Sequence, residues 1–445
     1  MTSPSEETTD RDAVGPALTE PTGPRSLRSH RPFLLLCAEQ AVSTLGRQVT
    51  ALALPLLAIT TLDAGPLGAA TLMGLTYLPG VLLSPLIGVL VDQARLRNLL
   101  ALLTTAQILV IGSVPLAARA DLLSWPHLFV VAMLSGGLTT IVGVGLQSVL
   151  PRVVQPDQLL PANSALTGAR TAGMIGGPAL GGVFIGLAAP DTALLVECAA
   201  YVVAVPLLLA LPTALNVPAA EGTAVRSRLK AMREGFAVIR RETLLRRQAL
   251  AAAGLNLGGG AAGALFVLYA TEELSLRPWE LGTAYATYAI AAALGVALAT
   301  PVTRALGMGR STQLCAIGAG VALFLIPAAS LGLAFPVLLL YELLFGLLAT
   351  VWLIAMITGR QLVTPTRMLG RVNAFLQAAL TAPLPIGAFA GGALATRIGI
   401  VPVLTGAAAV ALAGAASLWF PRDLHADIDR RAADAARERA GKENS

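Results

Sequence analysis

Twelve apolar stretches, each long enough to cross a lipid bilayer as a helix, recur along the chain and constrain its fold more than any other feature. A helical span needs about 20 apolar residues. Charged residues make up only 13% of the sequence, against roughly 25% in a soluble domain. The sequence therefore predicts an all-helical integral membrane protein. The predicted spans are residues 33–61, 66–91, 98–119, 126–150, 165–188, 191–212, 247–272, 281–304, 311–331, 334–358, 372–396 and 400–420.

The distribution of basic residues predicts the orientation of these spans, because arginine and lysine accumulate on the cytoplasmic side. If the N-terminus is inside, the short inner loops carry Arg95, Arg97, Arg152, Arg304, Arg310, Arg360, Arg367 and Arg371. The outer loops carry only Arg119, Arg277 and Arg397. We therefore expect a multi-pass protein of the cell membrane with both termini in the cytoplasm.

Three polar segments lie outside the spans. Residues 1–32 and 421–445 are predicted to be cytoplasmic tails, and residues 213–246 a cytoplasmic linker between six-helix bundles at 33–212 and 247–420. In the linker, Leu229, Met232, Phe236 and Ile239 share one helical face and basic residues take the rest. This pattern is typical of a helix lying on an anionic membrane surface.

Several functional classes lack the residues that they need. The basic residues are spread over loops without a nucleic-acid-binding module, and no HExxH metalloprotease pair or P-loop is present. The three cysteines, Cys37, Cys198 and Cys315, all fall in predicted spans, so no disulfide framework or metal site is implied. We expect neither enzyme activity nor a cofactor, metal or nucleic-acid partner.

Two segments separated by 210 residues resemble each other. Asn163 precedes Gly182 by 19 residues, and Asn373 precedes Gly392 by the same interval. A second anchor agrees, because the dipeptide at 66–67 aligns with the one at 278–279 at an offset of 212. Two parallel six-helix repeats are a feature of secondary transporters. A chance match of small residues in two apolar helices is the alternative interpretation.

Two motifs carry a resemblance to the major facilitator superfamily. The stretch "GVLVDQARLRNLL" (88–100) is similar to the family's loop after span two, with Gly88, Asp92, Arg95 and Arg97 matching in kind and Gln93 replacing the usual basic residue. The stretch "GMIGGPALGG" (173–182) resembles the family's antiporter motif G-x-x-x-G-P-x-x-G-G in span five. Its positions are filled by Gly173, Gly177, Pro178, Gly181 and Gly182.

The resemblance is to the branch that includes enterobactin exporters and macrolide efflux pumps, and it implies the twelve-helix major facilitator fold. It also implies gating roles for both motifs. Small residues spaced by four allow two membrane helices to approach closely, so we expect Gly173, Gly177 and Gly181 to form a contact between the halves that opens and closes. Static packing is the alternative. For Asp92, Arg95 and Arg97 we expect a charge cluster that latches the inner gate.

Charged residues within spans are costly and mark function by default. In span one, Gln40, Ser43 and Arg47 recur on one helical face with Glu39 at its edge. The resemblance implies that spans one, four, seven and ten line a central cavity, so the candidates for proton coupling or substrate binding are Glu39, Gln40, Arg47 and Glu342. It places span six at the periphery, which makes Glu197 structural. Arg170 either reaches the cytoplasmic interface, the preferred reading, or pairs with Glu39.

The sequence thus predicts a monomeric secondary transporter that exports a hydrophobic or amphipathic small molecule by proton antiport. Candidate substrates are a drug, a secondary metabolite or a siderophore. Span four lacks the arginine that proton-coupled exporters of the family carry, which makes proton coupling less firm than export. A nutrient facilitator or importer is one alternative. A membrane sensor or assembly factor that has kept the fold but lost transport is the other.

Overall fold

The computed structural model describes residues 27–155, 158–217, 239–363 and 380–419. Among these residues, nine helices are long and apolar enough to cross a membrane. The predicted all-helical membrane fold is confirmed. The predicted linker helix, most of both tails and the first residues of predicted span eleven lie outside the described residues.

The helices follow the predicted spans closely, because each apolar run is bounded by residues that start or stop a helix. In the first part of the chain they are α1 (Arg31–Leu62), α2 (Pro66–Gln93), α3 (Leu96–Arg119), α4 (Trp125–Val153), α5 (Leu159–Leu187) and α6 (Pro190–Leu209). Proline stands in the first turn of α1, α2, α4 and α6, where its missing N–H costs nothing. A short helix, η3 (Thr213–Asn216), follows.

The second part begins with α8 (Thr243–Leu268), which runs into a π-helical turn, η4 (Tyr269–Glu273). It continues with α9 (Pro278–Leu306), α10 (Met308–Ala322), α11 (Leu325–Ala328), η5 (Ala329–Leu331), α12 (Ala334–Val363), α14 (Pro383–Ile398) and α15 (Ile400–Ala416). Gly307 and Gly399 separate consecutive helices at φ 84°, a backbone conformation that favours glycine. Predicted span nine is divided among α10, α11 and η5.

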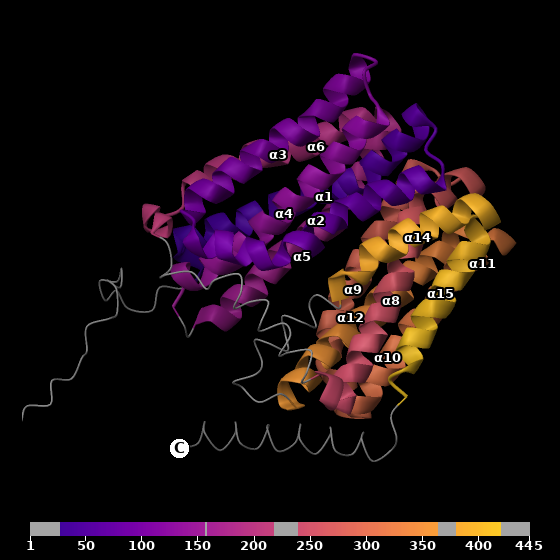
Figure 1. The fold of residues 1–445 in the computed structure, drawn as a ribbon. Helices are drawn as coiled ribbons and strands as arrows, with labels where there is room; N and C mark the ends of the chain where they lie inside the picture. The colour runs from indigo at the N-terminus through magenta and orange to yellow at the C-terminus, as the bar shows by residue number, and fades with distance from the viewer. Residues whose placement is uncertain (1–26, 156–157, 218–238, 364–379, 420–445) are drawn as a thin grey trace, which may run out of the picture.

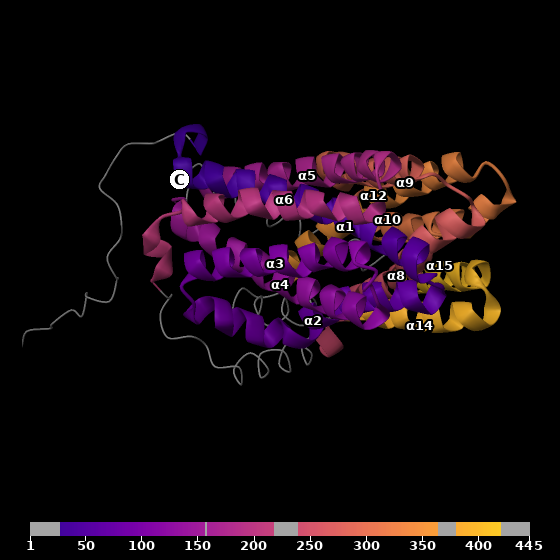
Figure 2. The same cartoon turned by 90° about the horizontal axis from the view of Figure 1, so that it is seen from above.

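The helices form two groups, which we call the first half (α1–α6) and the second half (α8–α15). In the first half α1 packs on α5 and α6, α2 on α4, and α3 on α6; in the second half α12 packs on α9, and α8 on α14 and α15. The halves meet through α5 with α9 and through α2 with α14. Figure 1 shows the two groups meeting at one end and diverging away from it, and Figure 2 shows the same meeting from above.

Candidate functional site

The first contact between the halves is made by backbone against backbone at Gly182 of α5. A Cβ atom placed on Gly182 would lie 3.0 Å from the carbonyl oxygen of Pro278 and 3.2 Å from the Cα atoms of Trp279 and Gly282. These three residues form the first turns of α9. From the other side, a Cβ on Gly282 would lie 2.6 Å from the carbonyl oxygen of Pro178. The two helices can approach this closely only because Gly182 and Gly282 have no side chains.

The second contact between the halves repeats the first. A Cβ on Gly392 of α14 would overlap the Cβ of Ala70 and lie 3.0 Å from the carbonyl oxygen of Pro66 and 3.4 Å from the Cα of Leu67. Gly392 is offset from Gly182 by 210 residues, and positions 66, 67 and 70 are each offset by 212 from 278, 279 and 282. The two segments that revealed the sequence repeat therefore contact each other across the halves. The contact occurs twice, at equivalent positions of the two repeats.

The glycine seam of α5 does not lie between the halves, so that part of the sequence prediction was wrong. A Cβ on Gly173 would lie 2.6 Å from the carbonyl oxygen of Ala41, and one on Gly181 would lie 3.3 Å from the Cα of Val49, both on α1 of the same half. Positions 181 and 182 are about 100° apart around a helix. The seam therefore faces α1 while Gly182, with Pro178 one turn before it, faces α9.

The same seam recurs in the second half. A Cβ on Gly387 of α14 would overlap the carbonyl oxygen of Leu257, and one on Gly391 would lie 2.8 Å from the Cβ of Ala261 on α8. Gly177 and Gly181 stand 210 residues earlier and pack on Leu45 and Val49, which stand 212 residues earlier. Each half therefore holds its own close helix pair and contributes one further glycine to the contact between halves.

Replacement of Gly177 by leucine is expected to destabilise the first half itself. A Cβ there would lie 2.6 Å from the Gln48 Cβ and 2.7 Å from the Leu45 carbonyl oxygen, and such overpacking costs about 1–3 kcal/mol. The measurement is the melting temperature in detergent, compared with Gly168→Leu, since a Cβ on Gly168 meets nothing within 4 Å. Equal melting temperatures of the two variants would contradict the close α1–α5 packing.

The loop motif after α2 is only partly described. Gly88 and Asp92 lie in the last two turns of α2. The surroundings of both residues lie outside the described part of the structure. Arg95 is exposed and precedes α3, whose first turn contains Arg97. Between described side chains, the ion pair found joins Arg119 to Asp191 at 3.6 Å. The latch formed by Asp92, Arg95 and Arg97 stays a prediction.

The polar residues of α1 include the buried Glu39, Ser43 and Thr44 and the half-buried Gln40 and Arg47. Glu39 is 1% exposed, and the Ser43 hydroxyl donates a hydrogen bond of 2.9 Å to its Oε1. Gln40 and Arg47 both donate to the Thr44 hydroxyl, at 3.0 and 2.8 Å. Glu39 was expected to line the central cavity as a residue for proton coupling or substrate binding. Its side chain is buried against its own half in this structure, and its role stays a prediction.

The residue that the sequence interpretation undervalued is Glu197 of α6. It is 3% exposed and accepts a hydrogen bond of 2.7 Å from the Tyr201 hydroxyl. A Cβ on Gly46 would lie only 2.9 Å from its Cα, so α6 packs directly on the polar face of α1. The positive charge of Arg47 acts on both Glu39 and Glu197. Arg47 nevertheless forms no ion pair within 4.0 Å with either of these described carboxyl groups.

This group of residues, which we call the α1–α6 acid cluster, comprises Glu39, Ser43, Arg47, Glu197 and Tyr201. In each of its two carboxyl groups one oxygen is buried without a hydrogen-bond partner in the described part of the chain. A buried carboxylate is costly unless it is paired and hydrogen-bonded. Two buried carboxyl groups with one arginine near them make this cluster a candidate proton site. The sequence did contain one sign that Glu197 has a polar partner: Tyr201 follows it by four residues, one helical turn later.

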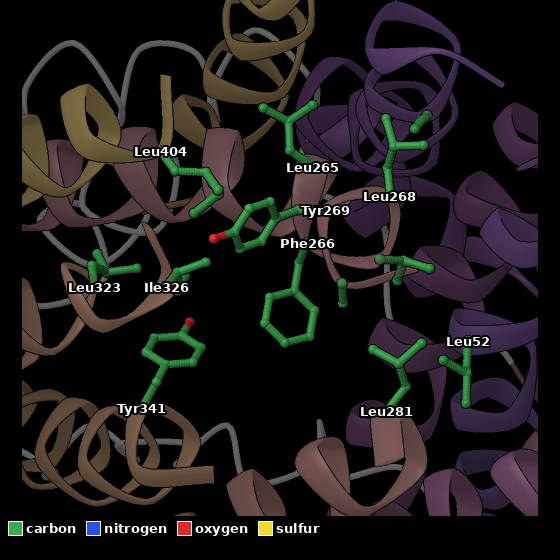
Figure 3. Close-up of a cluster of buried hydrophobic side chains, with 14 of the residues drawn as sticks. Leu52, Leu265, Phe266, Leu268, Tyr269, Leu281, Leu323, Ile326, Tyr341 and Leu404 are labelled. Carbon is green, nitrogen blue, oxygen red and sulfur yellow. The ribbon is translucent and has the colours of Figure 1, made fainter. Parts of the chain in front are cut away.

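Glu342 of α12 is buried elsewhere, in the second half. It is 5% exposed, and no ion pair to its carboxyl group is found between described side chains. The same half contains a cluster of aromatic rings on α8, α9 and α12, formed by Phe266, Tyr285, Tyr288, Tyr341 and Phe345. Figure 3 shows Phe266 and Tyr341 of this group.

A cavity of about 410 Å³ lies at the end where the halves meet, lined by residues of α2, α4 and α14 that include Thr71, Trp125 and Thr396. It is separate from both acid groups. Among the described residues, no group of three or more histidine, cysteine, aspartate or glutamate side chains is placed to hold a metal ion.

Comparisons with known proteins agree with this geometry. The family model described as Major Facilitator Superfamily matches residues 36–379. The chain is 27% identical over 402 residues to the uncharacterized MFS-type transporter y4rN of Sinorhizobium fredii, covering 90% of this chain and 97% of the relative. It is 24% identical over 401 residues to the uncharacterized MFS-type transporter YfiS of Bacillus subtilis, covering 84% and 89%.

Solved structures share the fold at low identity. A mutant of the nucleoside transporter NupG matches with a TM-score of 0.69 at 13% identity, covering 87% of this chain and 98% of that one. A bacterial homologue of the iron transporter ferroportin in its inward-facing state matches with a TM-score of 0.68 at 21% identity, covering 88% and 98%. At these identities the matches establish the fold alone.

Proposed function

We propose a function from the premise that this chain belongs to the major facilitator superfamily. It is a multi-pass membrane transporter and not an enzyme. The proposal is that it exports a hydrophobic or amphipathic small molecule, such as a drug, a secondary metabolite or a siderophore. Export proceeds by alternating access, is driven by exchange for protons, and is carried out by a monomer.

The observation that carries the proposal is the contact at one end of the two halves, made twice by equivalent residues. Gly182 meets the start of α9 and Gly392 meets the start of α2. A contact that is symmetric and confined to one end can open by rocking of the halves, as expected for a transporter built from two repeats. Packing across the whole interface would have opposed such a movement.

The direction of access follows from the proposed topology. The contact lies at the end that carries the α1–α2 turn, because Pro66 and Leu67 begin α2. With both termini in the cytoplasm, as the arginine distribution indicates, this is the extracellular end. The structure then represents a state closed to the outside, in which the bundles at 33–212 and 247–420 diverge toward the cytoplasm (Figure 1).

Proton exchange is supported by the α1–α6 acid cluster. The sequence contains no ATP-binding P-loop. The two buried carboxyl groups, each with one oxygen that has no described hydrogen-bond partner, offer a place for a proton within the membrane. The complete G-x-x-x-G-P-x-x-G-G motif at 173–182 favours an exporter over a nutrient facilitator. It resembles the motif of the enterobactin-exporter and macrolide-efflux branch, and a sensor without transport has no need of a contact that opens.

The proposal is tested by drug and metabolite accumulation in cells with and without the protein, across antibiotics, dyes and siderophores. We expect at least one compound to accumulate less in cells that make the protein, and a protonophore to abolish the difference. A compound that accumulates more would favour an importer. No effect on any compound, together with retained binding of a protein partner, would favour the sensor.

A further inference from the structure

The cavity of about 410 Å³ at the end where the halves meet has walls from both halves. Its lining comes from the α1–α2 turn and the starts of α2 and α4 in the first half, and from the end of α14 in the second: Asp63, Gly68, Thr71, Trp125, Phe129 and Thr396. Small-molecule sites have volumes of about 300–1,000 Å³. Thr396 stands one turn beyond Gly392, so the cavity borders the second contact between the halves.

The sequence repeat gives this cavity a counterpart beside the first contact, and there side chains occupy the corresponding positions. Glu280 is offset from Gly68 by 212 residues, and Phe335 is offset from Trp125 by 210. The Glu280 carboxylate accepts a hydrogen bond of 2.7 Å from the backbone N–H that precedes α9, and the Phe335 ring contacts that of Trp279 at 5.6 Å. Gly68 has no such side chain, and a Cβ on it would lie 2.5 Å from the Trp125 ring.

The polar side chains of the cavity present hydrogen-bond acceptors. The Thr71 hydroxyl donates its proton to the carbonyl oxygen of Leu67 at 2.7 Å, and the Thr396 hydroxyl donates its proton to that of Ala393 at 2.8 Å. A hydroxyl has one proton and two lone pairs, so both threonines accept from an occupant. Asp63 is an exposed carboxylate, and no ion pair to it is found between described side chains. A matching occupant donates hydrogen bonds and carries a positive charge.

The apolar wall of the cavity is aromatic. The rings of Trp125 and Phe129 have centroids 5.4 Å apart and planes inclined by 37°. Burial of an apolar group against these rings is favourable, and ring faces attract a cation by their quadrupole. An ammonium group attached to an aromatic body therefore fits both the polar and the apolar wall.

We propose that this cavity binds an organic ammonium compound with an aromatic body, and that the bound compound favours the closed contact. With the topology proposed above, the compound reaches the cavity from outside. The cavity is separate from the α1–α6 acid cluster and from Glu342, so the site is regulatory, which goes beyond the proposed export function. Thr396 belongs to the second half and the rings to the first. A ligand that contacts both halves binds the closed state more tightly and raises its population.

The test uses the purified full-length chain in detergent and three probes with the same ring system: naphthylethylamine, the neutral naphthylethanol and the anionic naphthylpropionate. We expect the amine to bind most tightly. Asp63→Asn should weaken binding of the amine about fivefold, as loss of an exposed charge pair does, and leave binding of the alcohol unchanged. Asparagine also tolerates the left-handed backbone of this position, where φ is 48°.

Thr396 tests the contribution of the second half. Thr396→Val keeps the shape but removes the acceptor, so it should weaken binding of the amine severalfold, whereas Thr396→Ser should not. The matched control is Glu272→Gln, because Glu272 is an exposed carboxyl group at the end of α8, and this variant should bind the amine as the wild type does. Equal binding of the three probes, tightest binding of the propionate, or unchanged binding of the amine in Asp63→Asn would overturn the site.

The effect on the contact is measured by spin labels on cysteines that replace Leu122 and Leu331, which are exposed and belong to different halves. Saturating naphthylethylamine should raise the population of the shorter distance. A fall or no change would refute the claim that the ligand favours the closed contact. Neither measurement uses a transported compound, so failure of the export proposal leaves both unaffected. Export by a chain that does not prefer the amine would refute this site alone.

Discussion

Replacement of Glu39 by glutamine is expected to abolish uphill efflux driven by a proton gradient while leaving substrate binding intact. Glutamine keeps the shape and can still accept the hydrogen bond from Ser43, but it cannot bind and release a proton. Glu39 is buried on α1 of the first half, whereas Glu342 lies on α12 of the second half. The measurement is efflux from proteoliposomes under a pH gradient, beside substrate binding in detergent.

Glu197 provides the decisive companion variant. From the sequence Glu197 was expected to be structural, but it is buried beside the polar face of α1. We therefore expect a partial loss of coupling when it is replaced by glutamine. Glu272→Gln serves as the exposed control. If Glu39→Gln and Glu197→Gln both pump at the wild-type rate against a gradient, the α1–α6 acid cluster is not the proton site. Asp92 would be the next residue to test.

Replacement of Gly182 by leucine is expected to hold the two halves apart at the end where they now meet. Its side chain would press on backbone atoms of Pro278, Trp279 and Gly282, and backbone cannot move aside as a flexible side chain can. The closed contact should become the minor state, and transport should fall to the background level. Substrate binding from the opposite side should persist.

The state of the contact can be measured by spin-label distances between Leu122 and Leu331, each replaced by cysteine in a cysteine-free background. Both positions are exposed, at 73% and 88%, and they belong to different halves. The distance should lengthen in Gly182→Leu and remain unchanged in Gly186→Leu, because a Cβ on Gly186 meets nothing within 4 Å. An unchanged distance in Gly182→Leu would show that the contact tolerates a side chain.

The sequence was sufficient to predict the helices and the repeat because both depend on local patterns. Span boundaries follow from apolar runs that end at proline, glycine and charged residues. The offset between Gly182 and Gly392 marks equivalent positions whatever their neighbours are. It did not predict which neighbour each glycine meets. Gly181 and Gly182 are adjacent in sequence but face α1 and α9, and small-residue spacing alone does not identify the partner helix.

The acids show a similar limit. The location of Glu39 and Glu342 within membrane spans was expected from the apolar runs that contain them, but their surroundings depend on helix packing. Gly46 admits α6 close enough to place Glu197 beside the polar face of α1, a contact between residues about 150 positions apart. The aromatic cluster of the second half likewise draws its rings from three helices. Neither set of contacts could be predicted from the sequence pattern of a single span.

The most direct test of proton-coupled export uses a compound identified in the cell screen. The measurement is the movement of this compound across the membrane of proteoliposomes that contain the wild-type chain. With equal compound concentrations on both sides and an imposed pH gradient, the compound should accumulate against its own gradient on the side of higher proton concentration. Collapse of the pH gradient by a protonophore should stop this accumulation. Movement that only equalises the two concentrations, at a rate independent of the pH gradient, would contradict proton-coupled export.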